Sequence, residues 1–392
     1  MIALTIVHPD LRPGRSGHDG AVYRLAVALA ERPDVTLRVV TGTRPAPLPP
    51  GVVVVRLPCL PVWHLSLRFL SFLLAWSVYR RLRRPGPDEV VYLGSPLLGG
   101  GDLAAVHFLS LDWQTAAWSS PPPVNWRLRL RTWHDHLRHA LAVPLECRAY
   151  RAAARGREPR LLPVSEGLAE RLETRFGAIP GLTVVPNIID TTRFHPAAEP
   201  DLDAAVRAAA GWPKHWPIVL FVGGAWQRKG LGVALRAMAA LSAPAGLLVV
   251  GPGPQAALQA EAVRLGIAPR VHAVGLQADT APFYRIAAAL VLPSLYETDG
   301  LVAWEALASG VPVVAAPFAG SEAWLRGGVT GYAARGAEAT AGALDRVLAD
   351  STLRDRCTAM SRDLVASRSP QVVAAQVVDL ARQVRTREVW DQ

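Results

Sequence analysis

Short apolar runs alternate with amphipathic stretches along the whole chain, and this alternation predicts parallel β-sheets covered by helices. The first segment shows an apolar run at residues 2–7, a turn that contains Gly17 and Gly20, a helical stretch at 21–31 and an apolar run at 35–40. A strand, a helix and a strand in this order form a βαβ unit, which begins a parallel sheet. The further strands expected in the first half lie at residues 52–55, 90–93, 103–106, 162–164 and 182–185.

A turn-rich stretch between Pro186 and Pro200 interrupts this pattern, and the alternation restarts after it. We therefore expect two Rossmann-like α/β domains, at residues 1–196 and 197–392. A terminal helix within 371–392 can also pack back on the first domain. The strands expected in the second half lie at residues 218–222, 247–250, 271–274, 290–292 and 311–315.

Length and composition agree with two globular domains. A chain of 392 residues exceeds the size of about 250 to 300 residues at which one core stops growing. Hydrophobic residues make up 51% of the chain and charged residues 19%, which argues against extensive disorder. The three cysteines are scattered, and the N-terminus lacks the pattern of a signal peptide. These features favour a cytoplasmic location.

Basic charge is concentrated in the first half. Residues 1–200 contain 24 arginines, no lysine and 16 acidic residues, so they carry +8 of the net charge of +10. Arginine in this excess favours an anionic partner such as a phosphate or a lipid headgroup, and a GC-rich coding bias is the alternative explanation. No nucleic-acid-binding module is recognisable, so we expect no nucleic-acid partner.

Residues 64–84 form an apolar segment that ends in arginines. The apolar part is shorter than the roughly 20 residues that span a bilayer. It fits a core helix of the first domain, or a helix lying flat on an anionic membrane with Trp76 and the arginines at the headgroup level. A second arginine-rich stretch, 126–160, with Trp113, Trp118 and Trp133 near its start, fits a membrane or glycolipid-phosphate contact or a solvated helix face.

Two glutamates flank an expected helix start in the second half. Glu297 and Glu305 stand on either side of Gly300, and a helix is expected from Leu301 onward. The free amides of Gly300, Leu301 and Val302 then form a site for a diphosphate. Glu297 can accept hydrogen bonds from sugar hydroxyls and Glu305 from a ribose diol. For the spacing alone, two surface glutamates are the better explanation.

A glycine turn with adjacent cations follows the strand at 218–222. Gly223 and Gly224 end the strand, and Arg228 and Lys229 precede the next helix. Such cations can neutralise a departing diphosphate, which lowers a barrier because the negative charge grows in the transition state.

These elements together resemble the retaining GT-B glycosyltransferases of family 4, the group 1 glycosyl transferases. The matching segments include FVGGAWQRKG, VVGPGP, VHAVGLQ, VVPNIID and PSLYETDGLVAWEALASGVPVVA, and the match is densest over residues 160–335. The RKG form of the cationic loop is similar to that of lipopolysaccharide-core glucosyltransferases. An arginine that the family often carries after the strand glycine is replaced by Gly224. The resemblance implies a GT-B fold with two Rossmann-like domains facing a central cleft.

The resemblance also implies a role for each matching residue. Glu297 contacts the donor sugar, Glu305 contacts the ribose, and Arg228 and Lys229 contact the diphosphate. The remaining donor-binding positions that the resemblance implies are Gly17, Ser165, Gly223, Gly224, Gly300, Leu301 and Val302. His107, directly after the strand at 103–106, matches a histidine that approaches the donor sugar.

The implied reaction is hexosyl transfer from a nucleotide-diphosphate sugar to a saccharide or glycolipid acceptor, with retention at the anomeric carbon. The resemblance implies no metal and no cofactor beyond this co-substrate, and it suggests a role in cell-envelope or exopolysaccharide biosynthesis at the inner face of the plasma membrane. The alternatives are a nucleotide-sugar epimerase of the same fold and a non-catalytic binding protein.

Overall fold

The computed structural model describes residues 1–13, 17–60, 65–83, 85–86, 88–118, 142–157, 159–209 and 211–390. The chain divides into two compact units. Unit 1 comprises Met1–Ile188 and Pro370–Gln392, and unit 2 comprises Ile189–Ser369. The chain thus passes between the units twice, once at the start of the turn-rich stretch and once before the last helix.

Unit 1 is built on a six-stranded parallel sheet with the order β3-β2-β1-β4-β5-β6. This is the strand order of a doubly wound Rossmann sheet. The order reverses between β1 and β4, so these two strands are neighbours although two others separate them in the sequence. The strands are β1 (Ile2–Val7), β2 (Val35–Thr41), β3 (Val53–Arg56), β4 (Glu89–Leu93), β5 (Leu103–Val106) and β6 (Arg160–Pro163).

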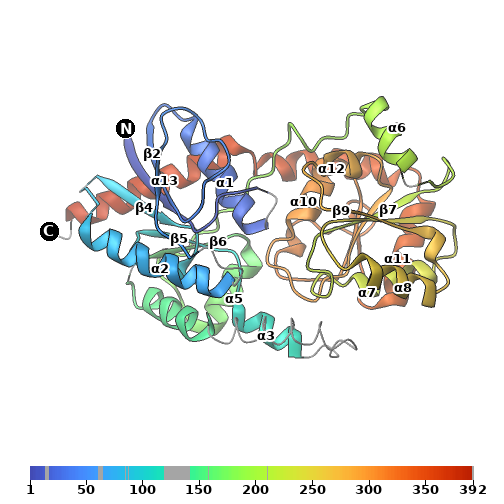
Figure 1. Ribbon diagram of the computed structural model, residues 1–392, viewed down its shortest axis with the longest axis horizontal. Coiled ribbons are helices and arrows are strands. Elements are labelled where there is room, and N and C mark those ends of the chain that lie inside the picture. Colours follow the sequence, from blue (N-terminus) through green and yellow to red (C-terminus); the bar gives the residue numbers. More distant parts are fainter. Residues whose placement is uncertain are drawn as a thin grey trace. The chain divides into compact units, whose positions relative to one another are not determined.

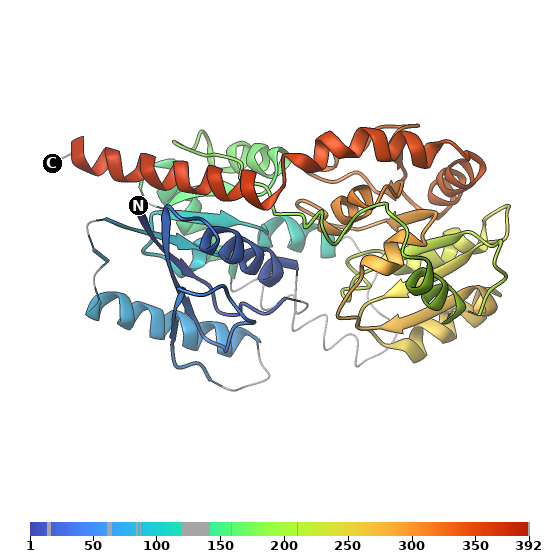
Figure 2. The same ribbon diagram turned by 90° about the horizontal axis from the view of Figure 1, so that it is seen from above.

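Helices cover both faces of this sheet (Figures 1 and 2). Ile2, Leu4 and Ile6 of β1 face a core formed with α1 and α13, whereas Val7 faces a core formed with α2 and α5. Two buried faces explain why the strands read as continuous apolar runs. The helices of unit 1 include α1 (Gly17–Ala30), α2 (Leu65–Leu82), α3 (Ser110–Trp118), α5 (Glu166–Phe176) and α13 (Pro370–Trp390), with a 3-10 turn at Pro96–Leu98. The described residues 142–154 are also helical.

The terminal helix α13 packs along α1 in unit 1. Gln376 Nε2 donates to the carbonyl of Val184 at 2.7 Å, and Arg382 pairs with Asp34. The prediction of a strand at residues 182–185 is wrong. Only Thr183 and Val185 donate backbone hydrogen bonds to β6, and the segment carries the chain out of unit 1 as an extended connection.

Unit 2 repeats the same topology. Its sheet has the order β12-β11-β10-β7-β8-β9, and the reversal lies between β7 and β10. The strands are β7 (Ile218–Val222), β8 (Gly246–Val250), β9 (Val271–Gly275), β10 (Ala289–Leu292), β11 (Val313–Ala315) and β12 (Gly331–Ala333). The short edge strand β12 was not among the predicted strands, because three residues leave no periodic pattern to read.

Helices also cover both faces of the second sheet. Val219 and Phe221 of β7 face α7, α8 and α11, whereas Ile218 and Leu220 face α9, α10 and α12. The helices are α6 (Pro200–Ala209), α7 (Leu231–Ala239), α8 (Gln255–Arg264), α9 (Ala281–Arg285), α10 (Leu301–Ala308), α11 (Ala337–Ala349) and α12 (Leu353–Ala366), with 3-10 turns at Ala268–Arg270 and Ser321–Ala323.

Candidate active site

The reversal in the second sheet brings Arg228, Lys229 and Glu297 together. The carboxyl ends of β7 and β10 lie side by side there, and such a point is where doubly wound sheets bind their ligands. Lys229 Nζ lies 2.9 Å and Arg228 Nη1 3.1 Å from the same oxygen, Oε1 of Glu297. Arg228 also donates to the carbonyl of Tyr296 at 2.8 Å. The predicted diphosphate cations and the predicted sugar carboxylate therefore share one cluster.

The cluster keeps Glu297 ionised. Burial alone would raise the pKa of this carboxyl, but the charges of Arg228 and Lys229, with hydrogen bonds from Lys229 and Ser294, lower the pKa to about 2. A carboxylate that is charged throughout the neutral range can accept hydrogen bonds from sugar hydroxyls. Two cations against one carboxylate also leave a positive excess that suits a phosphate group.

Glycine is required at position 223 by the approach of Lys229. Gly223 has φ of 136°, and a Cβ built on it would lie 2.4 Å from Cδ of Lys229. The lysine side chain thus crosses directly over the glycine backbone on its way to Glu297. Gly224, at the exposed end of the loop, lies against Pro252 of the β8–α8 loop.

Helix α10 begins as predicted, directly after Gly300. This glycine is the N-cap residue, with φ of 69°, and no side chain caps the helix there. In the part of the chain that the structure describes, the N–H groups of Gly300, Leu301 and Val302 donate no hydrogen bond. They are the free first-turn donors that can bind an anion.

Glu305 lies one turn further along α10 and is oriented by Tyr284. The Tyr284 hydroxyl donates to Oε2 of Glu305 at 2.8 Å, and the tyrosine itself is fully buried. Burial, and then the charge of Glu305, raises the pKa of Tyr284 well above its ordinary value, so it stays a donor. Sequence reasoning missed Tyr284, because its contact with Glu305 depends on how α9 packs against α10.

In unit 1, His107 lies at the end of β5 beside two further histidines. The His107 ring centroid is 4.2 Å from that of His18, which is 4.7 Å from that of His8. His8 Nε2 lies 2.9 Å from Asp19, and His18 Nε2 lies 2.7 Å from the carbonyl of Gly94. His8 and Gly94 follow β1 and β4, so this cluster lies at the reversal of the first sheet.

Burial, and then the repulsion from His8, lowers the pKa of His18 to about 4, and burial also lowers the pKa of His107 well below its ordinary value. Both imidazoles are therefore neutral at neutral pH. Sequence reasoning selected His107 and missed His8 and His18. The signal used for His107, a histidine directly after a strand, also applies to His8.

The other two predicted positions in unit 1 are Gly17 and Ser165. Gly17 is exposed at the first residue of α1. Ser165 is buried and is the N-cap residue of α5, where its Oγ accepts from the amide of Leu168 at 3.3 Å. Capping accounts for serine at position 165, and binding roles for Gly17 and Ser165 stay predictions.

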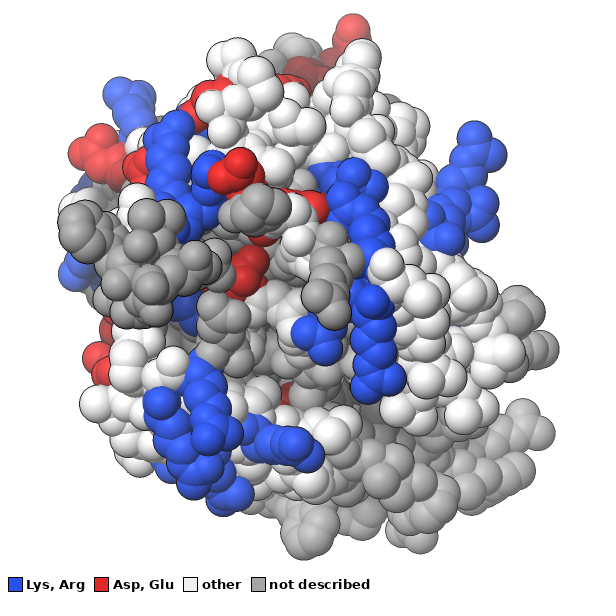
Figure 3. All heavy atoms as spheres, turned by 90° about the vertical axis from the view of Figure 1, so that its left-hand side faces the viewer, with Lys and Arg blue, Asp and Glu red and all other residues white. Residues whose placement is uncertain are grey.

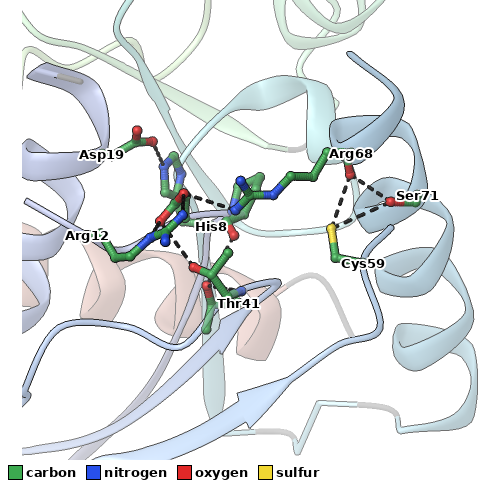
Figure 4. Close-up of polar contacts among 10 residues, drawn as sticks. His8, Arg12, Asp19, Thr41, Cys59, Arg68 and Ser71 are labelled. Atoms are coloured by element: carbon green, nitrogen blue, oxygen red, sulfur yellow. Dashed lines mark hydrogen bonds and ion pairs between the residues drawn. The ribbon is translucent and has the colours of Figure 1, made fainter. Parts of the chain in front are cut away.

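Asp10 joins the β1–α1 loop to α2 at the same edge of the first sheet. Arg12 donates to both oxygens of Asp10, and Arg68 of α2 donates to Oδ2 at 3.0 Å (Figure 4). Thr43 donates to Oδ1 at 3.1 Å. The carboxylate thus anchors the N-terminal part of α2 on the sheet.

Helix α2 has one buried and one exposed apolar face. Phe72 and Trp76 are buried in the core of unit 1, and Trp76 Nε1 donates to the carbonyl of Gly99 at 3.0 Å. Of the two alternatives for this segment, the core helix agrees with the burial of Phe72 and Trp76. The alternative that places Trp76 at the headgroup level is wrong for this residue, because its indole lies in the core of unit 1. His64 and Arg84 of the predicted segment lie outside the described residues.

The first part of the arginine-rich stretch 126–160 also lies outside the described residues, including Arg127, Arg129, Arg131, Arg138 and Trp133. Nothing is described of the Trp118 side chain. Of the described arginines in this stretch, Arg148, Arg151, Arg155 and Arg157 are exposed, which agrees with a solvated helix face, whereas Arg160 in β6 is half-buried.

Comparison with known proteins identifies the family. The group described as Glycosyl transferases group 1 matches residues 216–350. A protein of Streptomyces bingchenggensis named D-inositol 3-phosphate glycosyltransferase is 30% identical over 375 residues, which cover 84% of this chain and 77% of the relative. The chain belongs to the group 1 glycosyl transferases. The resemblance found in the sequence is thereby confirmed.

Solved structures confirm the GT-B fold of this group 1 chain. WaaG, a glycosyltransferase involved in lipopolysaccharide biosynthesis, has a TM-score of 0.76 at 18% identity, covering 96% of this chain and 99% of WaaG. HepE of Anabaena, solved with UDP and glucose, has a TM-score of 0.71 at 17% identity, covering 98% and 100%. This chain spans about half the length of the first curated relatives it matches, 43% to 55%.

Proposed function

We propose that this chain transfers a hexose from a nucleotide-diphosphate sugar to a saccharide or glycolipid acceptor, with retention at the anomeric carbon and without a metal ion. The observation that carries the proposal is the shared contact of Arg228 and Lys229 with Glu297, at the carboxyl edge of the second sheet. A sugar diphosphate carries hydroxyls and phosphates a few atoms apart, so its two recognition groups must also be neighbours. The solved complex of HepE with UDP and glucose supports a nucleotide-sugar donor.

The cluster also suggests how the residues act. A bound diphosphate would draw Arg228 and Lys229 away from Glu297, because its greater negative charge competes for the two cations. Glu297 would then be free to accept hydrogen bonds from the sugar. As the glycosidic bond breaks, charge grows on the leaving diphosphate, and the two cations stabilise it in place. We propose that the leaving diphosphate helps to deprotonate the acceptor.

A donor screen tests the proposal. UDP-, GDP- and ADP-sugars are added singly, and the melting temperature is measured, since a ligand that binds the folded chain raises it. We expect one base to give a clear shift and the Glu297→Ala variant to lose transfer while it still folds. Transfer that persists in Glu297→Ala would overturn the donor-site assignment. Turnover of the nucleotide sugar without any acceptor would instead indicate an epimerase.

Metal independence has a separate test. Transfer is measured with and without EDTA, and with added Mg²⁺ or Mn²⁺. We expect the same rate in each case, because Arg228 and Lys229 supply the positive charge beside the leaving group. A rate that falls with EDTA and returns with the ion would overturn this part of the proposal.

We further propose that α2 places the chain at the inner face of the plasma membrane during cell-envelope or exopolysaccharide synthesis. Its outer face exposes Leu67, Leu70, Leu74, Val78 and Leu82, with exposed fractions from 46% to 83%. In the helix these positions fall on one stripe, and an exposed apolar stripe is typical of an interaction surface.

Basic side chains accompany the stripe. Arg80 and Arg81 are exposed at the end of α2. Figure 3 shows Lys and Arg in several groups on this face of the molecule, with the acidic side chains mostly in its upper part. Apolar contact with attraction to anionic lipid supports surface attachment. Within the described residues, no helix is both long and apolar enough to cross a bilayer.

Vesicle sedimentation tests the membrane proposal. We expect the chain to bind vesicles with anionic lipid, more weakly as salt increases, and not vesicles of neutral lipid alone. The Leu70→Ser/Leu74→Ser variant should bind less. Val263→Ser is the matched control, because Val263 is 62% exposed but lies in unit 2. Equal binding by all three proteins would overturn the assignment to α2.

A further inference from the structure

Arg368 makes a buried, two-pronged contact with Asp299, the residue before the cap of α10. Its Nη1 and Nη2 donate to the two carboxylate oxygens of Asp299, each at 2.9 Å. The exposed fractions are 6% for Arg368 and 3% for Asp299. A buried carboxylate of this kind requires a fixed opposite charge, since desolvation of an unpaired charge is costly.

Trp304 completes the arrangement from the first turn of α10. The Arg368 Cζ lies 3.7 Å from the centre of the Trp304 ring. The indole Nε1 donates to Oδ1 of Asp299 at 3.0 Å. A flat guanidinium can pair with a carboxylate by two hydrogen bonds and stack on an aromatic ring at the same time, which a lysine ammonium cannot do.

Two further contacts hold the ends of this arrangement. The Phe318 ring lies so close to Gly300 that a Cβ there would be 2.6 Å from its Cζ. The backbone carbonyl of Arg368 accepts from the amide of Ile189 at 3.0 Å. Ile189 is the first residue of unit 2 and Arg368 the last but one, so Arg368 is anchored where the chain enters and leaves the unit.

We propose that Arg368 is a positioning residue that keeps the Asp299 carboxylate away from the free amides at the start of α10. The inference rests on the proposed function, in which those amides bind the donor diphosphate. A negative side chain beside the start of a helix is attracted by the free amides and the positive end of the helix dipole. An Asp299 released from Arg368 would place a negative charge among the donors of Gly300, Leu301 and Val302, where it competes with the diphosphate and repels it.

The proposal predicts a loss specific to the phosphate part of the ligand. In the Arg368→Lys variant the charge remains, but the two-pronged contact and the stacking on Trp304 are lost. With the base found in the donor screen, we expect the affinity for the nucleoside diphosphate to fall about tenfold or more. The affinity for the matching nucleoside should stay within about twofold. Titration calorimetry on the full chain measures both.

Arg285→Lys is the matched control. Arg285 is buried to the same degree in unit 2 and pairs with Asp203 at 2.9 Å. This variant should lower the melting temperature and leave the ratio of the two affinities unchanged. The ratio therefore separates positioning from a general loss of stability.

A double variant tests the mechanism directly. Asp299→Asn in the Arg368→Lys background removes the competing charge, so diphosphate affinity should return to within about threefold of the unaltered chain. An equal loss for nucleoside and nucleoside diphosphate, or no recovery in the double variant, would overturn the proposal. If the unaltered chain binds the nucleoside but no diphosphate, or binds no nucleotide at all, the proposed donor site fails first, and this inference fails with it.

Discussion

Lys229 Nζ lies 2.9 Å from Oε1 of Glu297, although 68 residues separate the two in the sequence. The contact joins the loop after β7 to the loop after β10, because these strands are neighbours at the reversal of the second sheet. The group that would bind a leaving phosphate is therefore in direct contact with the group that would bind the sugar.

Replacing Lys229 by Met should lower kcat by about 10² to 10³-fold, since one charge that stabilises the leaving group is lost. The pKa of Glu297 should also rise from its value of about 2, because one of its two cations is removed. Steady-state kinetics measure kcat, and thermal melting checks that the variant is still folded. Lys214→Met is the control, an exposed lysine in the same unit whose loss should leave kcat unchanged. A fall in kcat of less than threefold for Lys229→Met would refute the role.

Replacing Tyr284 by Phe should weaken nucleotide binding by about 2 to 10-fold, as expected for one lost hydrogen bond. The bond from Tyr284 orients Glu305, which would hold the ribose diol. The loss should therefore appear with a ribonucleotide and vanish with the 2′,3′-dideoxy nucleotide. Equal weakening for both ligands would show that Tyr284 acts elsewhere.

Replacing Gly223 by Ala should destabilise the chain by about 1 to 3 kcal/mol, since a side chain at this positive φ is strained. It should also reduce activity, because the new Cβ displaces Lys229 from its path to Glu297. Gly342→Ala is the comparison, a glycine inside α11 with open space around its Cβ. Gly342→Ala should raise the free energy of unfolding by about 0.5 to 1 kcal/mol. Urea unfolding measures this free energy for both variants.

The titration of His18 should make the free energy of unfolding depend on pH. The pKa of His18 is about 4 in the folded chain and near 6.5 in the unfolded chain. Between these two pH values the unfolded chain therefore binds a proton at His18 that the folded chain does not bind. The stability contribution of neutral His18 is complete above about pH 6.5 and is lost as the pH falls toward 4.

The His18→Gln variant keeps an amide donor for the carbonyl of Gly94 but cannot titrate. Its free energy of unfolding should fall less steeply than that of the unaltered chain between pH 6.5 and 4. The difference is about 1.4 kcal/mol per pH unit for one proton. Parallel curves for the two proteins would contradict the depressed pKa.

Local sequence patterns sufficed for most elements and for the chemistry of the second unit. Apolar runs with defined ends predicted eleven of the twelve strands of the two sheets, and the strand predicted at 182–185 failed because an extended apolar segment can also serve as a connection. The motif around Gly300 predicted the start of α10 correctly, since a glycine that adopts positive φ marks such a boundary.

No local sequence pattern could predict which distant side chains meet in the fold. His8, His18 and His107 meet because the sheet order places β1 beside β4 and β4 beside β5. Arg368 meets Asp299 because the chain returns past α10 after α12. The periodicity of apolar residues predicts which face of a helix or strand is buried, but it does not predict which element packs against that face. These partners are determined by the strand order and the helix packing of the whole fold, which depend on all contacts together.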